Sequence, residues 1–147
     1  MEYRSVLEFD EFWVDELVFR KNNDFQPAGR LRVENSFRVG YQPVSEGKTS
    51  LVSITCQLFS EDFELNQAPF FLRMKLTGRF FVEREEEAEA IGVKVDDILA
   101  ANTVAILFPY VRSAITTVTA AMGVPPIILP PINTFKLLEQ SEPDLQE

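Results

Sequence analysis

The sequence predicts an α+β domain in which a four-stranded antiparallel sheet is covered by one long helix. Four successive segments alternate apolar and polar residues with a period of two, which is typical of strands with one buried face. One later segment instead has apolar residues three and four positions apart, and a sheet with one apolar face needs such a helix to cover it. At 147 residues the chain has the length of one domain, so residues 1–147 are predicted to form a single domain.

The first predicted strand, Val6 to Phe19, changes phase along its length. Leu7 and Phe9 share one parity, whereas Phe12 and Val14 share the other. A change of phase within one strand indicates a bulge or a bend between Phe9 and Phe12.

A loop rich in turn-forming residues is expected from Lys21 to Gly29, and it carries one large aromatic residue, Phe25. Such a residue either folds back onto its own domain or contacts a neighbouring subunit or a ligand. Three further strands are marked by apolar residues of one parity: Leu31, Val33, Phe37, Val39 and Tyr41; Val52, Ile54, Cys56 and Leu58; and Phe70, Leu72, Met74, Leu76, Phe80 and Val82. Short loops between these strands favour an antiparallel sheet, and the lone Cys56 is expected to be a buried, inert thiol.

The long helix is expected to extend downstream of Phe108. Its buried stripe is predicted to hold Phe108, Val111, Ile115, Val118 and Met122. Gly123 is placed as a C-terminal cap, and Pro125 and Pro126 prevent the helix from continuing. Pro109 is expected either to kink the helix or to lie in its first turn.

The regions around the helix are expected to be less regular. The charged run Glu83 to Ala90 predicts a solvated link or a short surface helix. Four prolines between Val124 and Ile132 force an extended, apolar segment that should pack on something. A last short helix is expected from Thr134 to Gln140, and residues 141–147 are predicted to be a disordered acidic tail.

Composition narrows the function classes. The net charge of −9 argues against a nucleic-acid partner, because phosphate binding calls for clustered Lys and Arg. No apolar run approaches the length of a membrane span and no signal pattern is present, so we expect a cytoplasmic protein without direct membrane insertion. The chain has no His, no glycine-rich phosphate loop and no metal-spaced cysteines, which argues against an enzyme, a metal site or a cofactor. Acidic neighbours such as Asp15 and Glu16 should point to opposite faces of a strand and therefore should not converge on a substrate.

Three short motifs resemble the SecB family, the bacterial export chaperones. The segment Ile106–Arg112, followed by the amphipathic helix, the proline-rich loop and Pro131–Asn133, looks like the carboxy-terminal half of SecB. Asp24–Pro27 resembles the family's loop between the first two strands, and Gly78–Phe80 lies where the fourth strand carries Gly-x-Phe. The resemblance covers nearly the whole chain.

The resemblance implies a Greek-key sheet with the long helix and the short C-terminal helix packed on one side. It further implies a homo-oligomer, a dimer of dimers, in which sheets and long helices make the contacts, so that Phe108, Val111, Ile115 and Val118 are candidates for oligomer or helix packing. The implied activity is ATP-independent binding of unfolded or precursor polypeptides, a holdase function that serves protein export. Candidate groove residues by similarity are Phe25, Leu31, Val33, Ile127, Leu129, Leu137 and Leu138, although Leu31 and Val33 also fit an ordinary core.

The resemblance also names the SecA motor as a partner. In the family, SecA docking depends on an exposed strand surface with acids on the first and fourth strands. Glu16 keeps one first-strand acid and Leu72 matches the family's fourth strand, whereas Arg20 and Met74 stand where acids are expected. Losing a negative charge to Arg reverses the sign of that contact, which opposes a basic partner. The alternatives are a chaperone for one client, such as a toxin–antitoxin partner, and an adaptor or carrier of a small apolar ligand.

Overall fold

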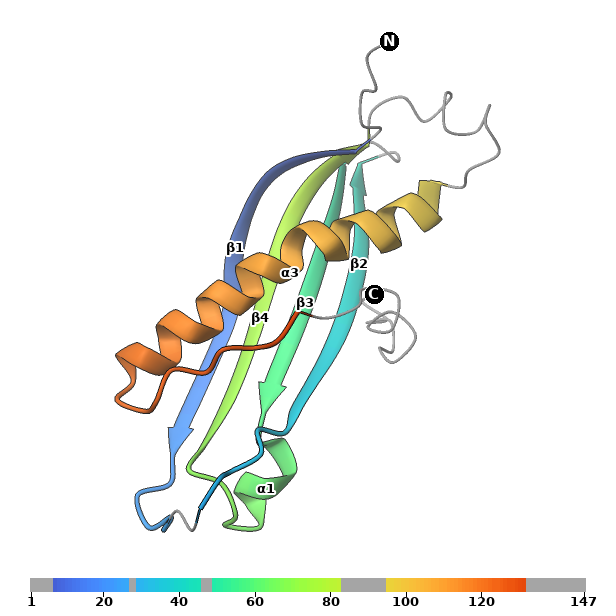
Figure 1. The fold of residues 1–147 in the computed structure, drawn as a ribbon. Helices are drawn as coiled ribbons and strands as arrows, with labels where there is room; N and C mark the ends of the chain where they lie inside the picture. The colour runs from blue at the N-terminus through green and yellow to red at the C-terminus, as the bar shows by residue number, and fades with distance from the viewer. Residues whose placement is uncertain (1–6, 27–28, 46–48, 83–94, 132–147) are drawn as a thin grey trace.

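The structure, a computed structural model, describes residues 7–26, 29–45, 49–82 and 95–131. Its elements are β1 (Leu7–Lys21), β2 (Asn35–Ser45), β3 (Thr49–Leu58), α1 (Ser60–Glu64), β4 (Phe70–Val82) and α3 (Val95–Ala121), which are labelled in Figure 1. The second strand begins at Asn35 and not at Leu31, because residues 30–34 lead into it without pairing in the sheet. The predicted charged link 83–90, the last helix 134–140 and the tail 141–147 lie outside the described residues.

The four strands form one antiparallel sheet in the order β1-β4-β3-β2. This order is a Greek key, because β2, β3 and β4 follow one another as neighbours while β1 lies beside β4. Figure 1 shows α3 and the segment that follows it on the same side of the sheet. We call that side the helix-facing side and the opposite side the outer face. The fold class predicted from the sequence is confirmed.

Strand β1 contains two bulges. The register against β4 shifts between Phe9 and Glu11, as the change of phase predicted, and again between Val14 and Glu16. Asp10 and Asp15 are the extra residues. Each bulge restores the phase of the strand, so Phe9, Phe12, Val14, Leu17 and Phe19 stay on the helix-facing side.

Helix α3 contributes one face to the core. Its fully or nearly buried apolar residues are Val104, Leu107, Phe108, Val111 and Ile115. Val118 packs against the core while partly exposed, but Met122 is 41% exposed, so the predicted stripe is wrong at its last position. The helix ends at Ala121 and Gly123 follows with a φ of 79°, as the cap signal predicted. It starts well before Pro109, which lies inside it on an exposed position.

Gly78 on β4 allows α3 to approach the sheet closely. A Cβ atom at this position would lie 2.5 Å from Leu107 Cδ2 and 3.1 Å from Phe80 Cε2. Both neighbours are fully buried, so neither has free space into which to move. The absence of a side chain at Gly78 therefore determines how deeply Leu107 packs.

The stretch Asn102–Ala121 of α3 is long and apolar enough to cross a membrane, with a mean hydropathy of 1.4. The statement from the sequence that no such stretch exists is therefore wrong. Of this stretch, 33% is buried inside the protein, and that part packs on the sheet. A core helix passes the same test of length and composition, so the stretch is weak evidence for a membrane span.

Candidate functional site

The proline-rich segment, residues 124–131, is fastened to α3 by three side chains. Arg112 Nε donates to the carbonyl oxygen of Leu129 at 2.9 Å, and Thr116 Oγ1 donates to the carbonyl oxygen of Ile127 at 2.7 Å. The backbone N–H of Ile127 donates to Thr119 Oγ1 at 2.9 Å. Prolines remove backbone donors from this segment, so it cannot form regular structure of its own and takes its polar partners from the helix.

This fastening decides which apolar side chains of the segment are available. Ile127 is partly buried against the core, Ile128 is 76% exposed, and Leu129 is 2% exposed. Most of the Leu129 side chain is thus buried in the core, and its role in client binding stays a prediction. Ile128, which the sequence reasoning did not select, is the exposed apolar residue in its place.

A hollow of about 340 Å³ lies between α3 and the proline-rich segment. We call it the α3 groove. Its lining residues are Pro109, Arg112, Ser113, Thr116, Thr117, Ile128 and Leu129. The groove thus combines the most exposed large apolar side chain of the described residues with hydroxyl groups of the helix.

The β1–β2 connection carries the other predicted groove residues. Leu31 is 42% exposed and Phe25 is half-buried, whereas Val33 packs against the core, as the core interpretation predicted. Glu34 anchors the end of this connection, because its Oε1 accepts hydrogen bonds from Ser60 Oγ at 3.2 Å and from the backbone N–H of Glu61 at 3.1 Å.

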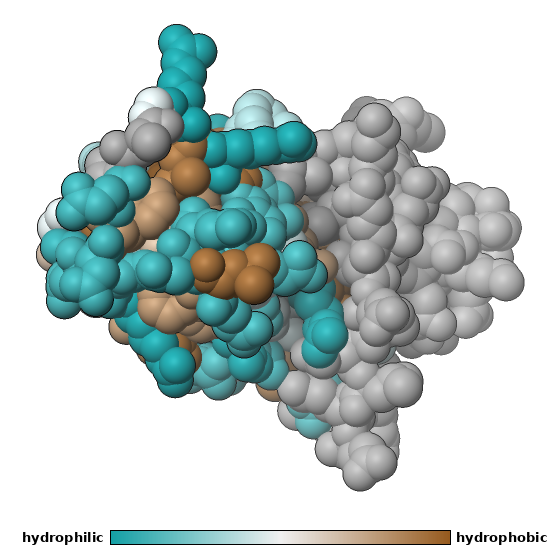
Figure 2. Space-filling model, turned by 90° about the horizontal axis from the view of Figure 1, so that it is seen from below, coloured by the Kyte–Doolittle hydropathy of each residue, from teal (hydrophilic) through white to brown (hydrophobic). Residues whose placement is uncertain are grey.

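The two sets of predicted groove residues lie in different parts of the fold. In Figure 1 the β1–β2 connection runs along the lower end of the sheet, whereas the proline-rich segment crosses its helix-facing side. The view of the lower end in Figure 2 shows apolar patches separated by hydrophilic side chains over the coloured surface. Leu137 and Leu138 lie outside the described residues, and with them the predicted lid.

A second exposed apolar surface follows the edge strand β1. Phe12, Val14 and Leu17 lie on the helix-facing side and are 42%, 45% and 40% exposed. The Phe12 ring packs against Tyr110 of α3 at a centroid distance of 4.4 Å. The sequence predicts these residues only as part of a strand, although the spacing from Val14 to Leu17 carries the signal of the second bulge.

The outer face carries paired charges. Arg73 Nε lies 3.0 Å from Glu16 Oε1, and Arg79 Nη1 lies 2.6 Å from Glu11 Oε1 and 3.4 Å from Asp10 Oδ2. Trp13 Nε1 and Thr77 Oγ1 both donate to the Asp15 carboxylate.

The second bulge therefore brings the side chains of Asp15 and Glu16 to the same face, so the expectation that they point to opposite faces is wrong.

Among the residues considered for SecA docking, Glu16 and Arg20 lie on the outer face, with Glu16 in its ion pair. Leu72 is fully buried and Met74 is 1% exposed, and both face the helix. The Leu72 side chain is therefore not on the surface of this chain, and its part in SecA docking stays a prediction; the outward neighbours on β4 are Phe71 and Arg73.

The described part of the chain holds no group of three His, Cys, Asp or Glu side chains arranged to bind a metal ion. Burial raises the pKa of the Cys56 thiol to about 12, so at neutral pH it is a protonated core side chain. Cys56 therefore supplies no reactive group to the α3 groove.

A family model described as preprotein translocase subunit SecB matches residues 7–144. The chain belongs to the SecB family. A relative from Methanocaldococcus jannaschii, the uncharacterized protein MJ0357, is 32% identical over 142 residues, which cover 95% of this chain and 86% of the relative. The protein-export protein SecB of Neisseria meningitidis serogroup B is 26% identical over 147 residues, with 96% of this chain and 93% of the relative covered.

A solved structure shows the same fold as this SecB-family chain. It is the SecB-like chaperone Rv1957 of Mycobacterium tuberculosis, in complex with a ChAD peptide from the antitoxin HigA1, Rv1956. The TM-score is 0.63 at 14% sequence identity, and the match covers 86% of this chain and 91% of the other. At this identity the match supports the fold and not the positions of the site residues.

Proposed function

We propose that this SecB-family chain is an ATP-independent chaperone that holds non-native polypeptides at the α3 groove. The observation that carries the proposal is Ile128, which is 76% exposed because its neighbours are fastened to α3 and the core. Non-native chains expose apolar side chains, and burial is worth roughly 25 cal/mol per Å² of apolar surface. The proposal involves no catalytic step, in keeping with a chain that has no His.

Individual contacts of this kind are weak, so a useful holdase needs several of them. Leu31 and Phe25 on the β1–β2 connection offer a second contact region for an extended client. A long client that touches more than one region gains affinity through effective concentration. Leu137 and Leu138 remain proposed members of the groove.

The decisive experiment is light scattering from a chemically unfolded client that is diluted into buffer with or without an equal concentration of this protein. We expect suppressed scattering for the wild type and a weaker effect for Ile128→Ser. Leu65→Ser is the matched control, because Leu65 is 65% exposed at the end of α1 and does not line the α3 groove. Unchanged scattering with the wild type would remove the holdase proposal.

In a narrower version of this proposal, the chaperone binds a single client. The structural neighbour named above was solved with a peptide from an antitoxin, which favours a chaperone for one partner as the second candidate. Mass spectrometry of the protein purified from its own host separates the two versions: a holdase carries many peptides, whereas a dedicated chaperone carries one polypeptide. A single small apolar molecule would instead support the carrier alternative.

We further propose that the chain works as a homo-oligomer in the cytoplasm and takes part in protein export. The exposed apolar row Phe12, Val14 and Leu17 on an edge strand supports self-association, because such an edge offers both apolar surface and unpaired backbone groups. Delivery to SecA would use the outer face around Glu16. A pull-down with purified SecA tests it, and equal capture by Glu16→Gln would exclude that residue from the contact.

A further inference from the structure

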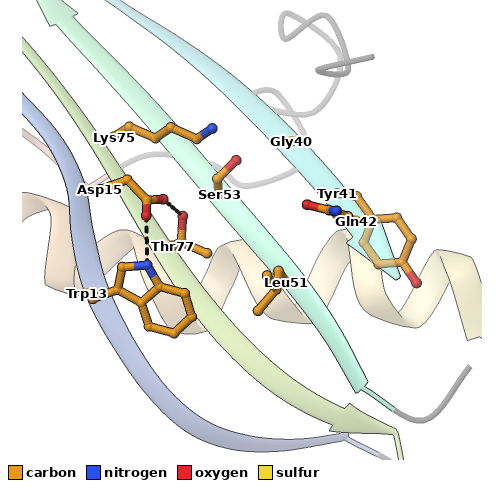
Figure 3. Close-up of a pocket in the computed structure, with 9 residues that line it drawn as sticks. All are labelled: Trp13, Asp15, Gly40, Tyr41, Gln42, Leu51, Ser53, Lys75 and Thr77. Atoms are coloured by element: carbon orange, nitrogen blue, oxygen red, sulfur yellow. Dashed lines mark hydrogen bonds between the residues drawn. The ribbon is translucent and has the colours of Figure 1, made fainter. Parts of the chain in front are cut away.

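The outer face contains a hollow of about 230 Å³ that none of the proposed client contacts uses (Figure 3). We call it the outer hollow. All four strands contribute to its lining, through Trp13, Asp15, Gly40, Tyr41, Gln42, Leu51, Ser53, Lys75 and Thr77. It lies on the side of the sheet opposite α3, so a ligand there need not compete with the α3 groove.

Small residues and a bulge build the hollow. Gly40 on β2 pairs with Ser53 on β3, so two neighbouring outward positions carry almost no side-chain volume. The second bulge of β1 places the Asp15 carboxylate on the same face, next to β4, where it accepts hydrogen bonds from Trp13 Nε1 and Thr77 Oγ1. These bonds fix the indole ring as one wall, and Leu51 supplies apolar surface on β3.

Lys75 supplies the charge. The two arginines in the outward row of β4, Arg73 and Arg79, are both engaged by carboxylates of β1. The Lys75 ammonium group has no hydrogen bond or ion pair with a side chain of the described residues, and Figure 3 shows the side chain extending from β4 towards Ser53 on β3. Within the described part of the chain, the hollow thus offers one ammonium group without a carboxylate partner, while the one carboxylate of its lining already has two donors.

This chemistry selects a singly charged anion that is attached to an apolar group. A carboxylate can pair with Lys75, accept from the Ser53 hydroxyl and leave an adjoining side chain to pack on Trp13. A phosphate would bring a larger negative charge next to Asp15, whereas protein phosphate sites combine several donors. Lys75 is the one cation of the lining, and Arg79, which lies 5.4 Å from the centroid of the Trp13 ring, is already paired with Asp10 and Glu11. A basic ligand would face Lys75 without an available carboxylate.

We propose that the outer hollow binds an acidic segment of a partner polypeptide, in which a carboxylate pairs with Lys75 and a neighbouring apolar side chain packs on Trp13 and Leu51. The net charge of −9 opposes the approach of such a segment. At physiological salt the Debye length is about 8 Å, so distant charges are largely screened and the contact with Lys75 dominates.

Trp13 makes the proposal directly measurable, because it is the single tryptophan of the chain. The probe is the blocked peptide acetyl-Ser-Glu-Phe-Glu-Ser-amide, titrated against the full-length protein while Trp13 emission and binding heat are recorded. The same peptide with Gln in place of both Glu residues is the matched control. We expect saturable binding of the Glu peptide and affinity that is lower by about tenfold for the Gln peptide, equivalent to about 1.4 kcal/mol.

Three variants locate the contact. Lys75→Gln should lower the affinity for the Glu peptide by about tenfold. Lys75→Arg should retain that affinity, since both lysine and arginine can bind a carboxylate. Ser53→Leu should abolish binding of both peptides, because it fills the floor of the hollow. Lys21→Gln removes an exposed cation at the end of β1, outside the hollow, and should change nothing.

The proposal is overturned if the Gln peptide binds equally well, if Lys75→Gln keeps full affinity, or if neither signal changes at peptide concentrations up to about 1 mM. The fold of each variant is checked by circular dichroism, so that loss of binding is not confused with unfolding. These readouts do not depend on client aggregation, so failure of the holdase proposal leaves this one standing, and the reverse also holds.

Discussion

Thr119 is the residue on which the path of the proline-rich segment depends. Its buried hydroxyl donates to the carbonyl oxygen of Ile115 at 2.8 Å and accepts the backbone N–H of Ile127 at 2.9 Å. Threonine is neutral to unfavourable inside helices on propensity alone, so its value here comes from the second bond, which reaches outside the helix.

Thr119→Val keeps the shape of the side chain but leaves the Ile127 N–H without its acceptor. We expect the free energy of unfolding to fall by about 1–3 kcal/mol, the range for an unsatisfied buried donor, as measured by urea denaturation. Thr117→Val is the control, because Thr117 Oγ1 bonds only to Ser113 within the helix on an exposed position. Its effect should stay within about 0.5 kcal/mol, and an equal loss in both variants would contradict the fastening role.

Cys56 should be unreactive as long as the fold is intact. Desolvation raises its pKa from 9.0 to about 12, and thiol reagents attack the thiolate. At pH 8 we expect no labelling by an aromatic disulfide reagent in buffer and stoichiometric labelling in denaturant. Because the pKa is higher in the folded state, the stability that this group contributes is complete below pH 9.0 and decreases as the pH rises towards about 12. Rapid labelling of the native protein would show that β3 is accessible.

At the scale of elements, β1 determines which surfaces the protein exposes. Its two bulges keep Phe9, Phe12 and Leu17 on the helix-facing side while bringing acidic neighbours to the outer face. Without the second bulge, the amino-terminal half of the strand would present its other face. Phe9 would then lose its stacking on Phe80, whose ring lies 5.2 Å away between centroids.

Deleting Asp15, the extra residue of the second bulge, tests whether this bulge determines which side chains of β1 face the helix. We expect the deletion to lower the free energy of unfolding by about 3–5 kcal/mol, comparable to removing a buried Phe, and to shift the emission maximum of Trp13 as the indole leaves the outer face. Asp15→Asn keeps the residue count, and with it the bulge, so it should cost less and leave Trp13 in place. A deletion variant with unchanged stability would mean that the bulge can relocate along β1.

Elements with a period in their sequence were predictable from that sequence. The parity of Val52, Ile54 and Leu58 gave the buried face of β3 correctly, because one face of a strand in a covered sheet must be apolar. The first bulge was visible as a change of phase, and the second had the same signal in the step from Val14 to Leu17.

The site was less predictable, because it depends on contacts between distant elements. In the proline-rich segment nearly every residue is apolar or proline, so no period indicates which side faces the core. Arg112 and Thr116 of α3 decide that Leu129 is buried and Ile128 exposed. The outer hollow likewise requires residues from four strands to meet, which only the sheet order specifies.

For the whole molecule, the apolar row on β1 predicts association between copies. The row lies on an edge strand next to α3, whose stretch from Asn102 to Ala121 contains one charged residue, Arg112. Val14→Glu places a charge in the row, and we expect sedimentation to show a shift from the oligomer towards the mass of a single chain. Val18→Glu is the control, because Val18 lies on the outer face of the same strand. A monomeric wild type, or an effect of Val18→Glu alone, would contradict self-association through this row.

The net charge of −9 predicts which clients the molecule prefers. A protein with a net negative charge attracts basic segments at long range, whereas burial of apolar surface at the α3 groove acts only on contact. For a peptide that carries Lys and Leu, we expect affinity to fall by about tenfold between about 0.05 and 0.5 M NaCl, as the Debye length drops below the distance between the exposed charges. A peptide in which Gln replaces Lys should bind more weakly at low salt and change little with salt. Equal, salt-independent affinities would assign client binding to apolar contact alone, and the acidic surface would then have no part in choosing clients.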